Sequence, residues 1–259
     1  MKKLFCMIAL AGLTLTAVAQ NQTLRLSSYN GTQLERYDGQ QCDVTIDRYL
    51  FNGWNTISLP FAMSEQEIDE VLGQGVKLER LVDATQQGTE IVLTFQDCKA
   101  EGLQANVPYI LYYPGESGSK KFHVNAQVTK KESKVTFTTG GGVKVSMHGA
   151  ALKTTGKDLY GILAINNAEA RFTPIDDSKS LFYATRCYVS IPGEQEFTLT
   201  TRHLAQGEVT SITNIAAEGD IVDVYNVLGM KVGSGIKASE INNLTPGIYV
   251  VKGHKVLVK

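Results

Sequence analysis

A chain of 259 residues is long enough for one large domain or two smaller ones. Its formal net charge of -1 lacks the basic excess that nucleic-acid-binding proteins carry, so we expect no nucleic-acid partner. A hydrophobic fraction of 43% is ordinary for a globular protein.

Residues 1–19 have the pattern of a secretory signal peptide. Lys2 and Lys3 give a positive start, residues 4–15 are mostly apolar, and Ala17-Val18-Ala19 is a typical cleavage site. The apolar run is too short for a membrane span and no later segment approaches that length, so we expect no transmembrane segment. The sequence therefore predicts an exported mature protein that begins at Gln20.

Residues 20–203 are expected to form a β-rich main domain. Turn signals recur about every ten residues, which is typical of antiparallel sheets packed as a β-sandwich, with a closed barrel as the less favoured alternative. Residues 107–113 are apolar on both faces, which predicts a central strand covered on both sides. The predicted strands are 23–28, 43–50, 54–59, 76–83, 90–95, 107–113, 122–129, 134–139, 143–147, 159–165, 170–174, 181–191 and 196–201.

One short helix is predicted just after the strand at residues 54–59. Ser64 and Glu67 have the spacing of a capping box, and Gly73 supplies a stop signal. Met63 and Ile68 occupy the two positions of a hydrophobic staple. These signals predict a helix of about two to three turns, which needs packing against the sheets to persist.

The predicted core is centred where this helix meets the sheet. Trp54, the only tryptophan, is interpreted as the anchor of that core, and a sugar-stacking role is the alternative. The expected core residues are Trp54, Leu59, Phe61, Ile68, Leu72 and Tyr109.

Three cysteines remain after the signal peptide: Cys42, Cys98 and Cys187. An odd number allows one disulfide at most, and no pair has the C-x-x-C spacing of a zinc or redox site. Buried, unpaired thiols are the favoured interpretation, with one disulfide as the alternative.

The sequence shows no local catalytic or metal-binding motif, and we expect no cofactor and no metal. The histidines are scattered, which favours solvated side chains over metal ligands: His123, His148, His203 and His254. Asp176 and Asp177 are best explained by a turn, and no spacing selects a pair of carboxylates for glycoside hydrolysis.

Five tyrosines are either core residues or, if exposed, platforms on which a sugar can stack: Tyr109, Tyr112, Tyr113, Tyr183 and Tyr188. Five lysines, at positions 120, 121, 130, 131 and 134, favour a solvated sheet edge, with a weak contact to an anionic glycan as the alternative.

Residues 204–219 are predicted to be a linker, and residues 220–259 a small β-sandwich-like C-terminal domain. Residues 224–232, 244–251 and 255–259 resemble the C-terminal sorting domain of the type IX (Por) secretion system of Bacteroidetes. The matching residues include Tyr225, Leu228, Gly229, Leu244, Gly247, Tyr249 and Lys259. The resemblance implies that the secretion machinery recognises this tail after export to the periplasm, and that the tail is often removed at the outer membrane.

Three segments of the main domain resemble a β-rich module of secreted proteins from gut Bacteroidetes: residues 53–61, 107–110 and 186–189. The leading hypothesis is therefore an exported, non-enzymatic structural or adhesive protein at the cell surface or outside the cell, with the periplasm as the alternative location. Its expected partners are the secretion machinery and an extracellular glycan or host protein. The alternatives are a carbohydrate-binding module and a glycoside hydrolase whose site is assembled from distant residues.

Overall fold

The computed structural model describes residues 22–156, 159–162, 171–175, 181–193, 195–205, 219–252 and 254–258. The predicted signal peptide, residues 206–218 of the predicted linker, Asp176, Asp177 and Lys259 lie outside these residues. In the described part, no helix has the length and apolar character needed to cross a membrane.

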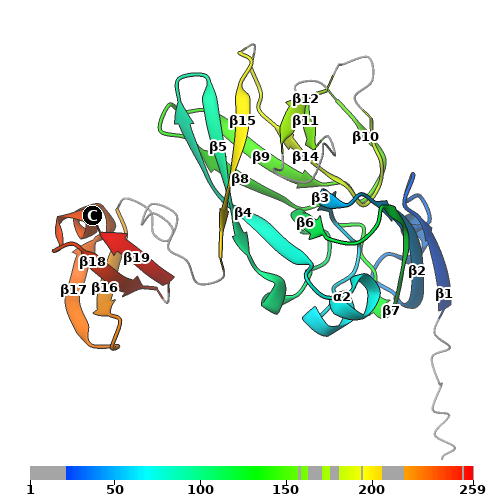
Figure 1. Ribbon diagram of the computed structural model, residues 1–259, viewed down its shortest axis with the longest axis horizontal. Coiled ribbons are helices and arrows are strands. Elements are labelled where there is room, and N and C mark those ends of the chain that lie inside the picture. Colours follow the sequence, from blue (N-terminus) through cyan, green and yellow to red (C-terminus); the bar gives the residue numbers. More distant parts are fainter. Residues whose placement is uncertain are drawn as a thin grey trace, which may run out of the picture.

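The chain is mostly β-structure, as predicted, and forms a main body followed by a C-terminal module (Figure 1). A sheet of β1, β2 and β7 and a five-stranded sheet in the order β15-β5-β4-β6-β3 contribute to the main body. A second five-stranded sheet has the order β12-β11-β14-β9-β8, and β10 pairs with β13. The strands are β1 (Gln22–Ser27), β2 (Gln41–Leu50), β3 (Gly53–Ile57), β4 (Lys77–Gln87), β5 (Glu90–Asp97), β6 (Tyr109–Tyr113), β7 (Gly118–Gln127), β8 (Lys134–Thr138), β9 (Lys144–Gly149), β10 (Thr154–Thr155), β11 (Leu159–Ile162), β12 (Phe172–Pro174), β13 (Leu181–Phe182), β14 (Cys187–Ser190) and β15 (Thr198–Leu204).

The sheet that contains β6 is covered on both faces. Tyr109 and Leu111 point into a core shared with β1, β2 and β7, whereas Ile110 points into a second core shared with β9 and β14. Because neighbouring side chains of a strand alternate between faces, β6 serves both cores at once. The prediction that residues 107–113 contain a doubly covered central strand is confirmed.

Two strand pairs are parallel, which the predicted all-antiparallel arrangement did not include. β1 runs parallel to β2, with Leu24 opposite Val44, and β15 runs parallel to β5, with Leu199 opposite Ile91. Both additions are at the edge of a sheet, and the pairing of β15 with β5 connects segments far apart in the sequence. In addition, residues 181–191 form two short strands, because Thr185 between them has a φ of 69°.

Helix α2 (Glu65–Leu72) forms as predicted. Ser64 accepts the backbone N–H of Glu67, and the Glu67 side chain accepts the backbone N–H of Ser64, so both halves of the capping box are present. Met63 and Ile68 are both buried in the first core, and Gly73 ends the helix with a φ of 84°. Two smaller helical turns were not predicted: α1 (Leu34–Tyr37) and the 3₁₀ helix η1 (Lys99–Glu101).

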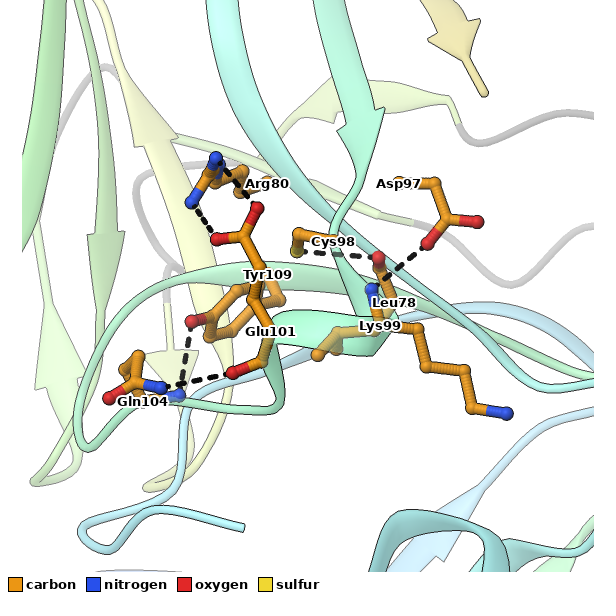
Figure 2. A network of polar contacts seen from close by, with 8 residues as sticks. All are labelled: Leu78, Arg80, Asp97, Cys98, Lys99, Glu101, Gln104 and Tyr109. Atoms are coloured by element: carbon orange, nitrogen blue, oxygen red, sulfur yellow. Dashed lines mark hydrogen bonds and ion pairs between the residues drawn. The ribbon is translucent and has the colours of Figure 1, made fainter. Parts of the chain in front are cut away.

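A polar network closes the end of the sheet beside η1 (Figure 2). The N–H and Sγ of Cys98 donate to the backbone carbonyl of Leu78 at 2.9 and 3.4 Å. The N–H of Gln104 donates to the hydroxyl of Tyr109 at 3.1 Å, and its side chain donates to Glu101 O. Burial raises the pKa of Cys98 and of Tyr109 to about 12 in each case. Burial therefore keeps both groups neutral, and the hydrogen bonds fix the turn after β5.

Cys42, Cys98 and Cys187 are all free and buried, as the favoured interpretation of the three cysteines predicted. Burial raises the pKa of each thiol, to about 12 for Cys98 and Cys187. Cys187 donates to the carbonyl of Ile57, so this thiol acts as a small packing group between two sheets.

The C-terminal module contains β16 (Ile221–Asn226), β17 (Lys231–Lys237), the 3₁₀ helix η3 (Ala238–Asn243), β18 (Gly247–Val251) and β19 (His254–Val258). Its strands form one antiparallel sheet in the order β17-β16-β18-β19. The small core includes Val224 and Val251 from the sheet and Ile241 from η3. A single sheet with a helical cover thus replaces the two facing sheets expected for this module.

Candidate functional site

Five of the six predicted core residues lie together in the first core. Leu59, Phe61, Ile68, Leu72 and Tyr109 are buried there, between 0 and 8% exposed. Helix α2 and strand β6 bring three of them together, and the segment that follows β3 supplies the other two.

Trp54 differs from the other five, and its assignment as the anchor where helix meets sheet is wrong. It lies on edge strand β3, is half-buried, and packs against the second core rather than against α2. Its ring stacks on His203 at 4.5 Å and meets Tyr112 edge-on at 5.4 Å. His203 Nδ1 lies 2.6 Å from the buried carboxylate of Glu79. This aromatic cluster is packed on itself and offers little free ring surface.

The expectation of scattered, solvated histidines fits only part of what the structure describes. His123 is exposed and lies 2.7 Å from a carboxylate oxygen of Asp43. His203 is also exposed, although its ring stacks on Trp54, whereas His148 is half-buried and differs from the expectation. Among the described residues, no three His, Cys, Asp or Glu side chains are grouped so that they could hold a metal ion.

The predicted tyrosines separate into three environments. Tyr109 and Tyr113 are buried, which fits the core interpretation. Tyr112 and Tyr188 are half-buried, and each ring packs against an aromatic neighbour. Tyr183 contacts the exposed ring of Tyr29, with ring centroids 4.4 Å apart.

The exposed large apolar side chains in the described part of the main body are Tyr29, Tyr49 and Phe51. Together with the half-buried Tyr183, whose ring contacts Tyr29, we call them the aromatic surface. Tyr29, Tyr49 and Phe51 are 52, 47 and 41% exposed. Tyr49 and Phe51 meet edge-on at 5.1 Å, and the rings of Tyr29 and Tyr183 are tilted by 32°.

The strand pairing explains why these residues occur at one edge of a sheet. β1 and β2 run parallel, so their C-terminal ends lie side by side. Tyr29 follows the end of β1, and Tyr49 and Phe51 lie at the end of β2. The backbone of Tyr29 also accepts a hydrogen bond from the N–H of Ala184, which fixes Tyr183 beside it.

Sequence reasoning considered Tyr183 but missed Tyr29, Tyr49 and Phe51. A signal for Tyr49 was present, because the alternation in β2 places it on the outward face with Asp43 and Asp47. An aromatic ring on the polar face of an alternating strand has no core to fill, so it is a candidate for binding.

Cationic side chains lie beside and beneath the aromatic surface. Lys153 Nζ is 5.1 Å from the centre of the Tyr29 ring. Arg186 is close enough to Tyr183 to interact electrostatically with it, and burial lowers the pKa of Arg186. Burial and the charge of Arg186 lower the pKa of Arg48 to about 9. Within the described residues, no carboxylate contributes to either shift.

Arg48 links β2 with β3 and with the segment between β13 and β14. It projects from β2, is 1% exposed, and donates to the carbonyl of Thr185 at 2.5 Å. It also donates to the Thr185 hydroxyl at 3.3 Å and to the carbonyl of Thr56 on β3. The guanidinium therefore fixes the left-handed residue that leads from Tyr183 into β14.

A second exposed apolar region lies in the C-terminal module and is mostly aliphatic. Its members are Ile221, Val227, Leu228, Met230, Val232 and Ile248. Leu228 is 80% exposed in the turn between β16 and β17, which we call the β16–β17 turn (residues 226–230). The side-chain carbonyl of Asn226 accepts the N–H groups of Leu228 and Met230, each at 3.0 Å. Gly229 provides the positive φ of 80° that this tight turn requires.

The remaining predicted sorting residues have structural roles within the module. Tyr225 lies on β16, with Lys231 Nζ 5.6 Å from its ring centre. Leu244 and Tyr249 pack against the module core, and the Tyr249 hydroxyl donates to a backbone carbonyl 2.8 Å away. Gly247 begins β18. Among the predicted sorting residues that the structure describes, only Leu228 and Gly229 are exposed.

A shallow groove of ≈ 520 Å³ lies between β12 and β15. Glu196 is the one carboxylate among the described residues that line it, together with Arg171 and a series of threonines. Glycoside hydrolysis needs two facing carboxyl groups, so this groove gives no specific support to that alternative.

Comparison with known protein families, with curated proteins and with solved structures finds no match for this chain.

Proposed function

We propose that this protein is an exported, non-enzymatic structural or adhesive component at the surface of a Bacteroidetes-type bacterium, or released from it. The C-terminal module is the part that the secretion machinery recognises, and the main body acts outside the cell. The signal-peptide pattern at residues 1–19 and the resemblance of the tail to a sorting domain support this assignment.

The exposed aliphatic side chains of the C-terminal module carry the proposal. Burying such a side chain is worth about 1.5–3 kcal/mol, so a small module gains nothing for its own stability by presenting them to water. Exposed apolar patches of this kind commonly mark interaction sites. The turn that presents Leu228 is rigidly hydrogen-bonded, so a partner can bind it without first ordering it.

The main body supports the non-enzymatic part of the proposal through the use of its buried polar groups. Arg48 and Cys187, which are 1% exposed, and Glu79, which is 3% exposed, all bind groups on other segments of the main body. Such contacts favour a stiff body that resists deformation. A stiff β-body with an attached tail suits adhesion or a structural role at the cell surface.

The test is fractionation of native host cells that express either the full chain or a version truncated before Asp220. We expect the full chain at the surface or in the medium, and intact-mass analysis should show that its tail has been shortened. The truncated version should stay in the periplasm. Leu228→Asp should behave like the truncation, whereas Lys237→Asp, an exposed change elsewhere in the module, should behave like the full chain. Surface delivery of the truncated version would refute the sorting role.

A further inference from the structure

We propose that the aromatic surface and the two cations next to it, Lys153 and Arg186, bind a carbohydrate that carries negative charge. This inference deepens the adhesive role proposed above by naming a ligand class and a place on the main body. It concerns binding by purified protein, so its failure would leave the export role of the C-terminal module untouched.

The kind of side chain favours a sugar as the ligand. Flat aromatic rings with polar hydroxyl groups fit the C–H faces and hydroxyl groups of pyranose rings, and they lose little conformational entropy when they bind. The exposed large apolar side chains in the described main body are all aromatic, whereas those of the C-terminal module are mainly aliphatic. The two regions therefore suit different partners.

The charge around the rings favours an acidic sugar. Lys153 is exposed beside Tyr29, and Arg186 is partly exposed next to Tyr183. Buried Arg48 adds a third positive charge close by. Lys153 and Arg186 therefore offer positive charge beside the Tyr29–Tyr183 pair that a uronate or sulfate group can neutralise.

Lys153 has a specific part in this binding. In the free protein its ammonium group lies over the Tyr29 ring at 5.1 Å, where the contact is exposed and weak. An anionic group can draw the flexible lysine away, which forms an ion pair and opens the ring face to the sugar. Tyr183 remains in place because Thr185, two residues further along the chain, is held by Arg48.

The other aromatic cluster of the main body is less suitable and provides a matched control. Trp54 is covered by His203 on one face and meets the edge-on ring of Tyr112. Lys77 lies over Tyr112 at 5.9 Å, so it makes the same kind of contact as Lys153 but on a packed ring. Lys77→Ala therefore removes the same charge and the same kind of cation–π contact as Lys153→Ala, but it leaves the proposed site unchanged.

Isothermal titration calorimetry with three tetrasaccharides tests the inference: tetragalacturonate, a sulfated heparin-derived tetrasaccharide, and neutral cellotetraose. We expect binding of one or both acidic sugars and at least about tenfold weaker binding of cellotetraose. Tyr29→Ala and Lys153→Ala should each weaken acidic-sugar binding by about fivefold or more, and Lys77→Ala by less than about twofold. Raising NaCl from about 0.05 to about 0.5 M should weaken binding, because salt screens exposed charges.

Several outcomes would overturn the inference. These are no binding of either acidic sugar, equal binding of cellotetraose, or equal effects of Lys153→Ala and Lys77→Ala. Circular dichroism of each variant checks that it is folded. If Tyr29→Ala is not folded, Tyr29→Leu gives the same test, because leucine fills space but cannot stack on a sugar face.

Discussion

Two replacements of Arg48, by methionine and by alanine, distinguish its role as a hydrogen-bond donor from its role in filling space. The side chain is 1% exposed and reaches from β2 to Thr185 and to Thr56 on β3. Methionine keeps much of the volume but donates no hydrogen bond, and alanine removes the volume as well. We expect both changes to destabilise the main body, with alanine the more costly.

The expected magnitudes follow from the acceptors that remain. The carbonyl of Thr185 still receives the N–H of Ser58 at 3.1 Å, whereas the carbonyl of Thr56 lies on an edge strand and loses its guanidinium donor. One buried acceptor without a donor costs about 1–3 kcal/mol, partly offset by relief of charge burial, and this is the loss expected for Arg48→Met. Alanine adds a cavity, so Arg48→Ala should cost about 3–5 kcal/mol.

Urea unfolding followed by Trp54 fluorescence measures these losses, because the single tryptophan lies in β3 and reports on the main body. Arg25→Met is the matched control, since Arg25 is 79% exposed in its ion pair with Asp47 on the same sheet. The control should change stability by less than about 0.5 kcal/mol. A more stable Arg48→Met variant, or an Arg48→Ala cost below about 1 kcal/mol, would refute the role of Arg48 as an inter-sheet link.

Three further predictions concern the helix, the thiols and one histidine. Ser64→Ala removes the capping box and should cost about 0.5–2 kcal/mol in urea unfolding, whereas Gln66→Ala on the exposed side of α2 should cost much less. The three buried cysteines should react with Ellman's reagent at neutral pH only after unfolding, and rapid labelling of the native protein would contradict their burial. Burial and the charge of Lys134 lower the pKa of His148 below 6.5, so the unfolded chain takes up the proton more readily. Its contribution to stability is therefore present above about pH 6.5 and lost at lower pH. His148→Gln should make this acid loss smaller in unfolding midpoints measured across pH.

The sequence was most informative where structure depends on neighbouring residues. The signals of Ser64, Glu67 and Gly73 lie within one turn of the helix ends that they define, so they could be recognised without the fold. The same applies to β6, whose two apolar faces are present in its own residues. Such features need no information about which distant segment is the partner.

The sequence was least informative where a partner far along the chain decides the outcome. The parallel pairing of β15 with β5 joins residues such as Leu199 and Ile91, and no local pattern specifies that choice. Tryptophan is a residue type that is often buried in a core, but the strand of Trp54 is at a sheet edge. Its ring therefore packs against His203 near the surface. Tyr29 was missed because it lies beside the end of β2 only through the parallel pairing of β1 with β2, which its own neighbours in the sequence do not specify.

Arg48 connects the stability of the main body with the proposed glycan site, and this connection can be measured. The side chain is buried, so it cannot touch a ligand, but it holds Thr185, two residues after Tyr183. It also contributes positive charge beneath the rings, with a pKa near 9. Arg48→Met should therefore weaken binding of an acidic tetrasaccharide even where the variant is fully folded.

Arg48→Lys distinguishes the two ways in which this residue can act. Lysine keeps the charge but cannot reach two carbonyls with one planar fork. If lysine restores binding, the positive field is what the ligand requires. If binding stays weak in both variants, the position of Tyr183 is decisive, and neutral and acidic sugars should lose affinity by the same factor. Unchanged binding in both variants would show that the rigid support beneath the aromatic surface is not needed for recognition.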